Sequence, residues 1–253
     1  MSQREDILQQ LKRFDTVFIV DDSGSMQGDG WKQAEYALAK IAPLAAKYDD
    51  DGIEIQFLNS KKVVKNVKSV AEITALFKDV RPSGRTPIGT RLEVLLGDYL
   101  ERLTTWENWK TQQTTHETVQ KTASEKSPSI FRKFRGMKSI LDQPIKPVKP
   151  VNYVFITDGG PTDEPRNRAE NAIVSTAERL NEIDASISQM GIQFVQVLND
   201  PSATNFLKNL DDNLKNKYGI RDIVDTTTSE IGKVLDLEKV LLGAINRRVD
   251  DRG

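Results

Sequence analysis

Carboxylate and hydroxyl side chains follow directly after an apolar run near the start of the chain. Residues 15–20 read DTVFIV, a nearly continuous run of β-branched and aromatic residues that is typical of a strand covered on both faces. The next five residues are Asp21, Asp22, Ser23, Gly24 and Ser25. Because the glycine permits a tight turn, this loop can direct Asp21, Ser23 and Ser25 toward one centre.

A second apolar run ends in the same type of chemistry. Residues 152–159 read NYVFITDG and predict a buried strand that ends in Asp158, while a separate loop, SGRTPIGT, places Thr86 just before a helix. Ligands of open α/β sheets bind beyond the carboxyl ends of the strands, where the strand order reverses. If the two strands are neighbours at that point, the loop that begins at Asp21 and the loop that begins at Asp158 converge.

Oxygen ligands of this kind suit hard divalent cations. Hydroxyls and carboxylates without histidine or cysteine favour Mg²⁺, with Mn²⁺ and Ca²⁺ as alternatives. The chain has no cysteine, which excludes thiol catalysis and thiolate zinc sites, and its one histidine is His116. A nucleophilic Ser23 or Ser25 would need a base, and His116 lies in the irregular segment 104–150.

The same residues also have simpler interpretations. DDSGS alone could be a helix N-cap turn with acidic residues near the helix dipole, an interpretation that the addition of Thr86 and Asp158 weakens. Receiver domains also carry an acidic pair after their first strand, but GIEIQFLN at 52–59 offers no phosphorylatable aspartate. Neither G-x-G-x-x-G nor G-x-x-x-x-G-K-[ST] occurs in the chain, so nucleotide binding by those routes is unsupported.

Strand and helix patterns alternate along the chain, which predicts a mostly parallel sheet between two layers of helices. The expected strands are residues 15–20, 52–59, 61–67, 152–159, 192–200 and 222–227. The expected helices are residues 2–13, 31–48, 69–80, 86–103, 166–187, 203–214 and 230–248. We therefore expect a single domain over residues 1–253 with a Rossmann-like, doubly wound α/β fold. Its mostly parallel, six-stranded sheet has one antiparallel edge strand, and residues 1–14 form an N-terminal helix.

One segment departs from this pattern. Residues 104–150 are polar, basic and poor in periodicity, and they end in PIKPVKP, which favours an extended polyproline conformation. We interpret them as an insertion within the domain. A solvated, flexible loop is the simplest role for it, and docking of an acidic partner or RNA is the alternative.

Composition narrows the functional classes. The chain has 253 residues and a net charge of −1, which argues against general nucleic-acid binding and against attachment to an anionic membrane. The first residues, MSQREDILQQLKRFD, are charged throughout, and no stretch of about 18 apolar residues occurs. We expect a cytoplasmic protein with no membrane span and no nucleic-acid partner.

Three loops together resemble one known family. DDSGS matches the Asp-x-Ser-x-Ser signature of the von Willebrand factor type A (vWA) domain, and GRTP and ITDGGPTD look like the Thr and Asp loops of that family. The resemblance covers residues 15–249 apart from the insertion. The stretch FIVDDSGSM after a short charged helix resembles intracellular fungal members.

The resemblance implies a metal-ion-dependent adhesion site (MIDAS). The implied metal residues are Asp21, Ser23, Ser25, Thr86 and Asp158. In that family Ser23, Ser25 and usually Thr86 would touch the ion through their hydroxyls. The carboxylates would act mostly through bound waters, which fits Mg²⁺ because it retains waters readily. Weaker candidates for the rim are Asp22, Arg85 and Asp163.

The function that follows is a non-enzymatic one, cation-dependent binding of a protein partner through an acidic side chain of that partner. The alternatives are a metal-dependent hydrolase, and a scaffold with a vestigial metal site that binds through the basic insertion. Some relatives couple metal occupancy to a shift of the C-terminal helix, which would be residues 230–248 here.

Overall fold

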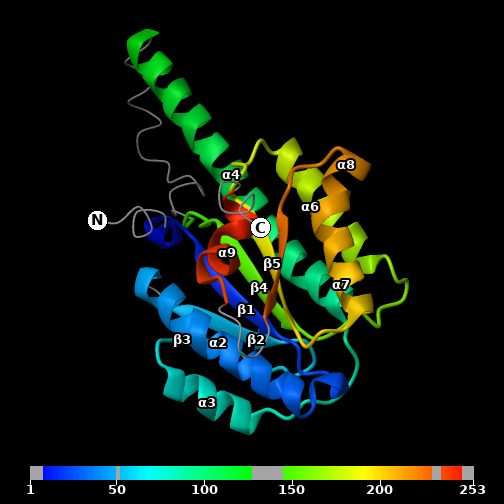
Figure 1. The fold of residues 1–253 in the computed structure, drawn as a ribbon. Helices are drawn as coiled ribbons and strands as arrows, with labels where there is room; N and C mark the ends of the chain where they lie inside the picture. Colours follow the sequence, from blue (N-terminus) through cyan, green and yellow to red (C-terminus); the bar gives the residue numbers. More distant parts are fainter. Residues whose placement is uncertain (1–7, 50–51, 127–144, 230–234, 247–253) are drawn as a thin grey trace. The chain divides into compact units, whose positions relative to one another are not determined.

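The computed structural model describes residues 8–49, 52–126, 145–229 and 235–246 (Figure 1). The chain divides into two units. One consists of residues 1–96 and 149–253 and carries the sheet, and the other is residues 97–148. Each unit is described by itself.

The sheet confirms the expected fold class. Its six strands are β1 (Asp15–Val20), β2 (Ile53–Phe57), β3 (Val64–Val67), β4 (Val151–Thr157), β5 (Met190–Val197) and β6 (Val224–Ser229). They are ordered β3-β2-β1-β4-β5-β6. All neighbours are parallel except β2 and β3, so the one antiparallel strand is at the edge of the sheet, as predicted for residues 61–67. The strand order reverses between β1 and β4.

Helices surround this sheet. The α-helices of the described residues are α2 (Asp29–Tyr48), α3 (Val70–Asp79), α4 (Ile88–Lys126), α6 (Arg168–Glu182), α7 (Pro201–Lys208), α8 (Leu214–Tyr218) and α9 (Leu237–Leu242). Short 3₁₀ turns are η1 (Gln9–Arg13), η2 (Gly24–Met26) and η5 (Gly243–Ile245), and η4 (Asn209–Asn213) is a π-turn. Within the described ranges, no helix combines the length and apolar character needed to cross a bilayer.

Both faces of the sheet are covered. Every residue of β4 and β5 is buried, which explains their almost continuous apolar sequence. On one face, side chains of α2 and α9 pack with the strands around Phe18 and Val154. On the other face Phe155 and Phe194 are buried, with ring centroids 5.3 Å apart. These two layers fix the central strands, and through them the loops at the carboxyl ends.

Several element boundaries differ from the sequence prediction. The helix predicted over residues 230–248 does not continue through its described part, because Asp236 caps the start of α9 by accepting from the backbone N–H groups of Glu238 and Lys239. Residues 230–234 and 247–248 of this prediction lie outside the described residues. The helix predicted over residues 203–214 begins earlier and continues through η4 and α8 to Tyr218. The predicted N-terminal helix extends into residues 1–7, which lie outside the described residues, and its described part is η1.

The prediction of an irregular segment from residue 104 is wrong for residues 104–126, which continue helix α4. This stretch has many threonines and no clear apolar stripe. The hydroxyls of Thr111, Thr114 and Thr115 donate to backbone carbonyls one turn earlier at 2.9–3.0 Å, which satisfies them within the helix. Residues 145–150 have no regular structure, and residues 127–144 lie outside the described part of the chain.

We predict that replacing residues 105–148 by a short Gly–Ser linker leaves the sheet unit folded. All six strands and their covering helices, apart from part of α4, lie outside that segment. Trp31 stays in the shortened chain and packs against Phe77, with ring centroids 4.4 Å apart, so its fluorescence reports this core. Urea unfolding followed by fluorescence should remain a single cooperative transition. Aggregation or a gradual, non-cooperative transition would contradict the prediction.

Candidate metal centre

The candidate residues meet where β1 and β4 end side by side. The two strands are parallel neighbours, with Val20 opposite Ile156. The chain leaves β1 at Asp21, whose backbone N–H donates to the Ile156 carbonyl at 2.9 Å. The structure therefore confirms that these strands are adjacent at the point where the strand order reverses, and it brings the Asp21 and Asp158 loops together.

A chain of side-chain oxygens connects the two loops. The hydroxyl oxygens of Ser23 and Ser25 lie 3.0 Å apart, and the Ser25 hydroxyl donates to Asp158 Oδ1 at 3.1 Å. The short turn η2 after Ser23 allows both serines to reach the same place. Ser23 and Asp158 are buried, whereas Ser25 is exposed. The cluster thus opens to solvent on the Ser25 side.

The Asp21 carboxylate interacts with the Ser23 side chain and also stabilises the backbone of the loop. Its Oδ1 accepts from the backbone N–H of Ser23 at 2.9 Å, and its Oδ2 accepts from the Thr157 hydroxyl at 2.6 Å. Sequence reasoning missed Thr157. Its position directly before Asp158, on a strand that neighbours β1, is the signal that could have identified it.

The protein environment disfavours charge on both carboxyl groups. Burial raises the pKa of Asp21 from its usual 3.8 to about 6, although hydrogen bonds from Thr157 and Ser23 oppose the shift. Burial also raises the pKa of Asp158, and the negative charge of Asp200 adds to this, while the Ser25 hydrogen bond opposes it. A bound cation would reverse this effect, because it favours the ionised form of both groups.

The third loop is fastened to the other two through its backbone. Gly24 N–H donates to the Gly84 carbonyl at 3.0 Å, and Ser83 N–H donates to the Asp22 carbonyl at 2.7 Å. Thr86 is buried and exchanges two hydrogen bonds of 2.9 Å with Thr162, one through each backbone N–H. Among the described residues, the Thr86 hydroxyl makes no hydrogen bond to the other four candidate metal residues. The position of Thr86 is therefore set by the hydrogen bonds of its backbone to Thr162.

Two of the residues considered for the rim have a different role. Asp22 is buried, and its carboxylate accepts from the backbone N–H groups of Asn59 and Ser60 at 2.7 and 2.9 Å. Asp163 is also buried and contacts the first residues of α4. Both connect loops and are not surface groups. Arg85 is exposed and donates to the Thr162 carbonyl at 3.0 Å, which is compatible with a rim position.

The donor set is made of hydroxyls and a pair of carboxylates. No group of three or more His, Cys, Asp or Glu residues that could hold a metal occurs within the described ranges. A site here would rely on Ser23, Ser25 and Thr86 for neutral oxygen ligands, and on Asp21 and Asp158 for charge. That composition fits Mg²⁺, which prefers oxygen ligands and retains bound waters. The residues present therefore fit the group that the sequence motifs imply.

We predict that Asp21→Asn stabilises the metal-free protein at alkaline pH relative to the wild type. An acid with a raised folded-state pKa loses stability as pH rises from its unfolded-state value to its folded-state value, here between 3.8 and about 6. The full displacement corresponds to about 3 kcal/mol, because each pH unit is worth about 1.4 kcal/mol. The asparagine can still accept from Ser23 N–H. Urea unfolding in EDTA should show the variant gaining on the wild type between pH 4 and pH 8. An equal difference at both pH values would contradict the assignment.

Comparisons with known proteins add no further assignment to this arrangement. No family model matches the sequence, and no curated protein matches it. The functional interpretation therefore depends on the chemistry and positions of the residues described above.

Proposed function

We propose that this chain is a divalent-cation-dependent protein-interaction module of the MIDAS type. The observation that carries the proposal is the meeting of Ser23, Ser25 and Asp158 at the carboxyl edge of the sheet. In this proposal the metal is Mg²⁺, with Mn²⁺ and Ca²⁺ as alternatives. The partner is a protein that offers an acidic side chain.

Charge balance connects the donor set to this function. Hydroxyl ligands are neutral, so an ion held mainly by Ser23, Ser25 and Thr86 keeps part of its positive charge. Asp21 and Asp158 would supply negative charge and would hold waters bound to such an ion. The exposed side of the cluster, at Ser25, leaves room for one more ligand. A carboxylate from a partner is the ligand that such an ion binds most strongly, since it supplies both a negative charge and an oxygen donor.

The hydrogen bonds of the carboxylates favour binding over hydrolysis. A metal-dependent hydrolase needs a general base that can take a proton from the attacking water. Both oxygens of Asp21 already accept hydrogen bonds from the protein, and one oxygen of Asp158 accepts from Ser25. These bonds hold the loops in place, which suits a binding site more than a site of proton transfer.

Calorimetric titration of Mg²⁺ into the metal-free protein tests the metal site. We expect saturable binding at one site, and a loss of affinity of at least about 10-fold in Ser23→Ala and in Asp158→Asn, since each removes an oxygen donor or its charge. The Ser23 hydroxyl bonds to Ser25 and interacts with the Asp21 carboxylate, while the backbone N–H of Ser23 donates to Asp21. The alanine variant therefore keeps the bond that shapes the loop.

Ser83→Ala is the matched control for the serine variant. Ser83 is exposed and belongs to the adjacent loop, where its backbone N–H donates to the Asp22 carbonyl. We expect this control to bind Mg²⁺ with wild-type affinity. Equal affinity in Ser23→Ala and the wild type would contradict the proposed site. Unfolding of Ser23→Ala would show that the serine is structural and would also count against it.

Selection from a random peptide library tests the class of partner. We expect peptides selected in Mg²⁺ to contain an essential Asp or Glu, because the open coordination position requires a carboxylate. Replacement of that residue by Asn or Gln, or addition of EDTA, should abolish binding measured by fluorescence polarisation. Selected peptides that bind equally well in EDTA would contradict a metal-dependent interaction.

A further inference from the structure

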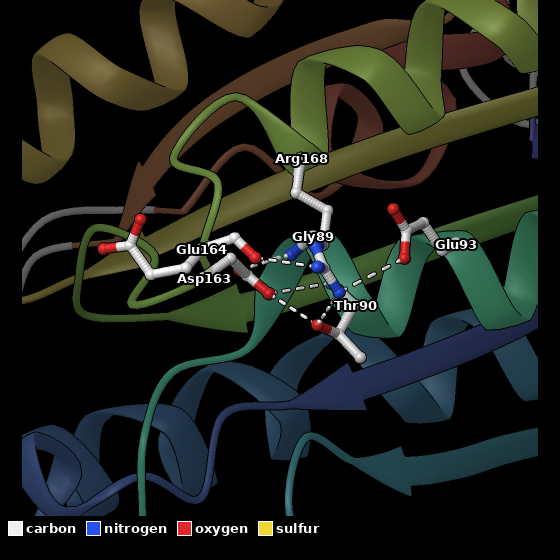
Figure 2. A network of polar contacts seen from close by, with 6 residues as sticks. All are labelled: Gly89, Thr90, Glu93, Asp163, Glu164 and Arg168. Carbon is white, nitrogen blue, oxygen red and sulfur yellow. Dashed lines mark hydrogen bonds and ion pairs between the residues drawn. The ribbon is translucent and has the colours of Figure 1, made fainter.

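Asp163 is directed at the first residues of helix α4 (Figure 2). Its Oδ2 accepts from Gly89 N–H at 2.8 Å, and its Oδ1 accepts from the backbone N–H and the hydroxyl of Thr90 at 2.9 and 2.7 Å. The carboxyl group is buried. Both of its oxygens therefore hold the first turn of a helix that belongs to a different segment of the chain.

Arg168, the first residue of helix α6, also contacts the start of α4. Arg168 donates to the Thr90 hydroxyl at 3.2 Å and to the Glu164 carbonyl at 2.7 Å, and it forms an ion pair with Glu93 at 3.5 Å (Figure 2). Gly89 permits the close approach of the two helices. A Cβ atom at that position would lie 2.7 Å from the backbone nitrogen of Ala169, which is too close for any side chain.

Two candidate metal residues lie close in sequence to the contact between Asp163 and the start of α4. Thr86 precedes Gly89 by three residues, and Asp158 precedes Asp163 by five. The paired hydrogen bonds between Thr86 and Thr162 connect the same two stretches again, directly beside Asp163. The spacing between Thr86 and Asp158 therefore depends on the contact between Asp163 and the start of α4.

We propose that Asp163 is a positioning residue of the metal site. By fastening the start of α4 to the loop after β4, it holds the Thr86 hydroxyl at the distance from Asp158 that a shared cation requires. Asp163 acts through Thr86 and does not touch the ion. This inference rests on the proposed function, because it concerns the geometry of the same site.

Removal of a residue that only caps a helix would have a different effect on stability and on metal affinity. Acidic residues at a helix N-terminus stabilise the helix, and their removal lowers the stability of the protein. Such an effect alone would leave metal affinity unchanged. A positioning residue changes metal affinity, and it does so only as long as the residue that it positions is present.

A double-mutant cycle between Asp163 and Thr86 separates these two roles. Mg²⁺ affinity is measured by calorimetry for the wild type, Asp163→Asn, Thr86→Val and the double variant, all in the full chain. We expect Asp163→Asn to weaken Mg²⁺ binding by about 10-fold, as loss of an outer partner of a metal ligand commonly does. In the Thr86→Val background the same change should have no further effect. Two independent effects that multiply, or full affinity in Asp163→Asn, would overturn the inference while the proposed function stands.

Asp236→Asn is the matched control, because Asp236 also caps a helix through two backbone N–H groups, on α9. We expect it to lower stability and to leave Mg²⁺ affinity unchanged. Weakened Mg²⁺ binding in this control would overturn the inference, because general destabilisation would then explain the effect. If Asp163→Asn does not fold, Thr90→Val replaces it, because it removes the exposed hydroxyl that donates to Asp163 Oδ1. Absence of Mg²⁺ binding by the wild type would instead overturn the proposed function, and this inference with it.

Discussion

The parallel pairing of β1 with β4 is the constraint on which the candidate site depends. These two strands lie at the centre of the sheet, where the strand order reverses, and they end at the same level. Asp21 and Asp158 follow those ends, so the packing that buries the strands also buries their carboxyl groups. The raised pKa values of both groups are a direct result. The sheet thus buries two carboxyl groups whose negative charge a cation or a proton would neutralise.

Three loops converge on the candidate site because polar side chains accept hydrogen bonds from backbone N–H groups of the neighbouring segments. Asp22 connects the β1 loop to Asn59 and Ser60, Thr162 connects the β4 loop to Thr86, and Asp163 connects it to α4. Each of these carboxylates and hydroxyls replaces hydrogen bonds that loop backbones would otherwise make with water. Of the five candidate metal residues, Ser25 alone is exposed, which is compatible with the single incoming ligand of the proposed function.

The sequence predicted the elements whose signals are local. Apolar runs identified β1, β4 and β5, and the helix predicted over residues 69–80 agrees with α3, where Ser69 and Glu72 form a capping box. The five candidate metal residues were also chosen from motifs, and the structure places their loops together. Asp22 and Asp163 were misjudged, because the side of a loop to which a carboxylate points depends on contacts with residues far away in sequence.

The missed features share a physical reason. Thr157 and Thr162 act on partners more than 70 positions away, so no local pattern marks them. Residues 104–126 lack the apolar stripe by which an amphipathic helix is recognised, and their threonine hydroxyls bond within the helix instead. The start of α9 was missed, because the apolar periodicity of this region does not mark Asp236 as the residue that caps the helix.

The most direct test of the metal site is an anomalous-scattering experiment on crystals grown with Mn²⁺. A difference map calculated from data collected at the manganese absorption edge locates the ion without reference to any assumed ligand. The account predicts one strong peak at about 2.1–2.3 Å from the hydroxyl oxygens of Ser23 and Ser25, with Asp21 and Asp158 in reach of its bound waters. A peak bound to other residues, with none at these serines, would contradict it.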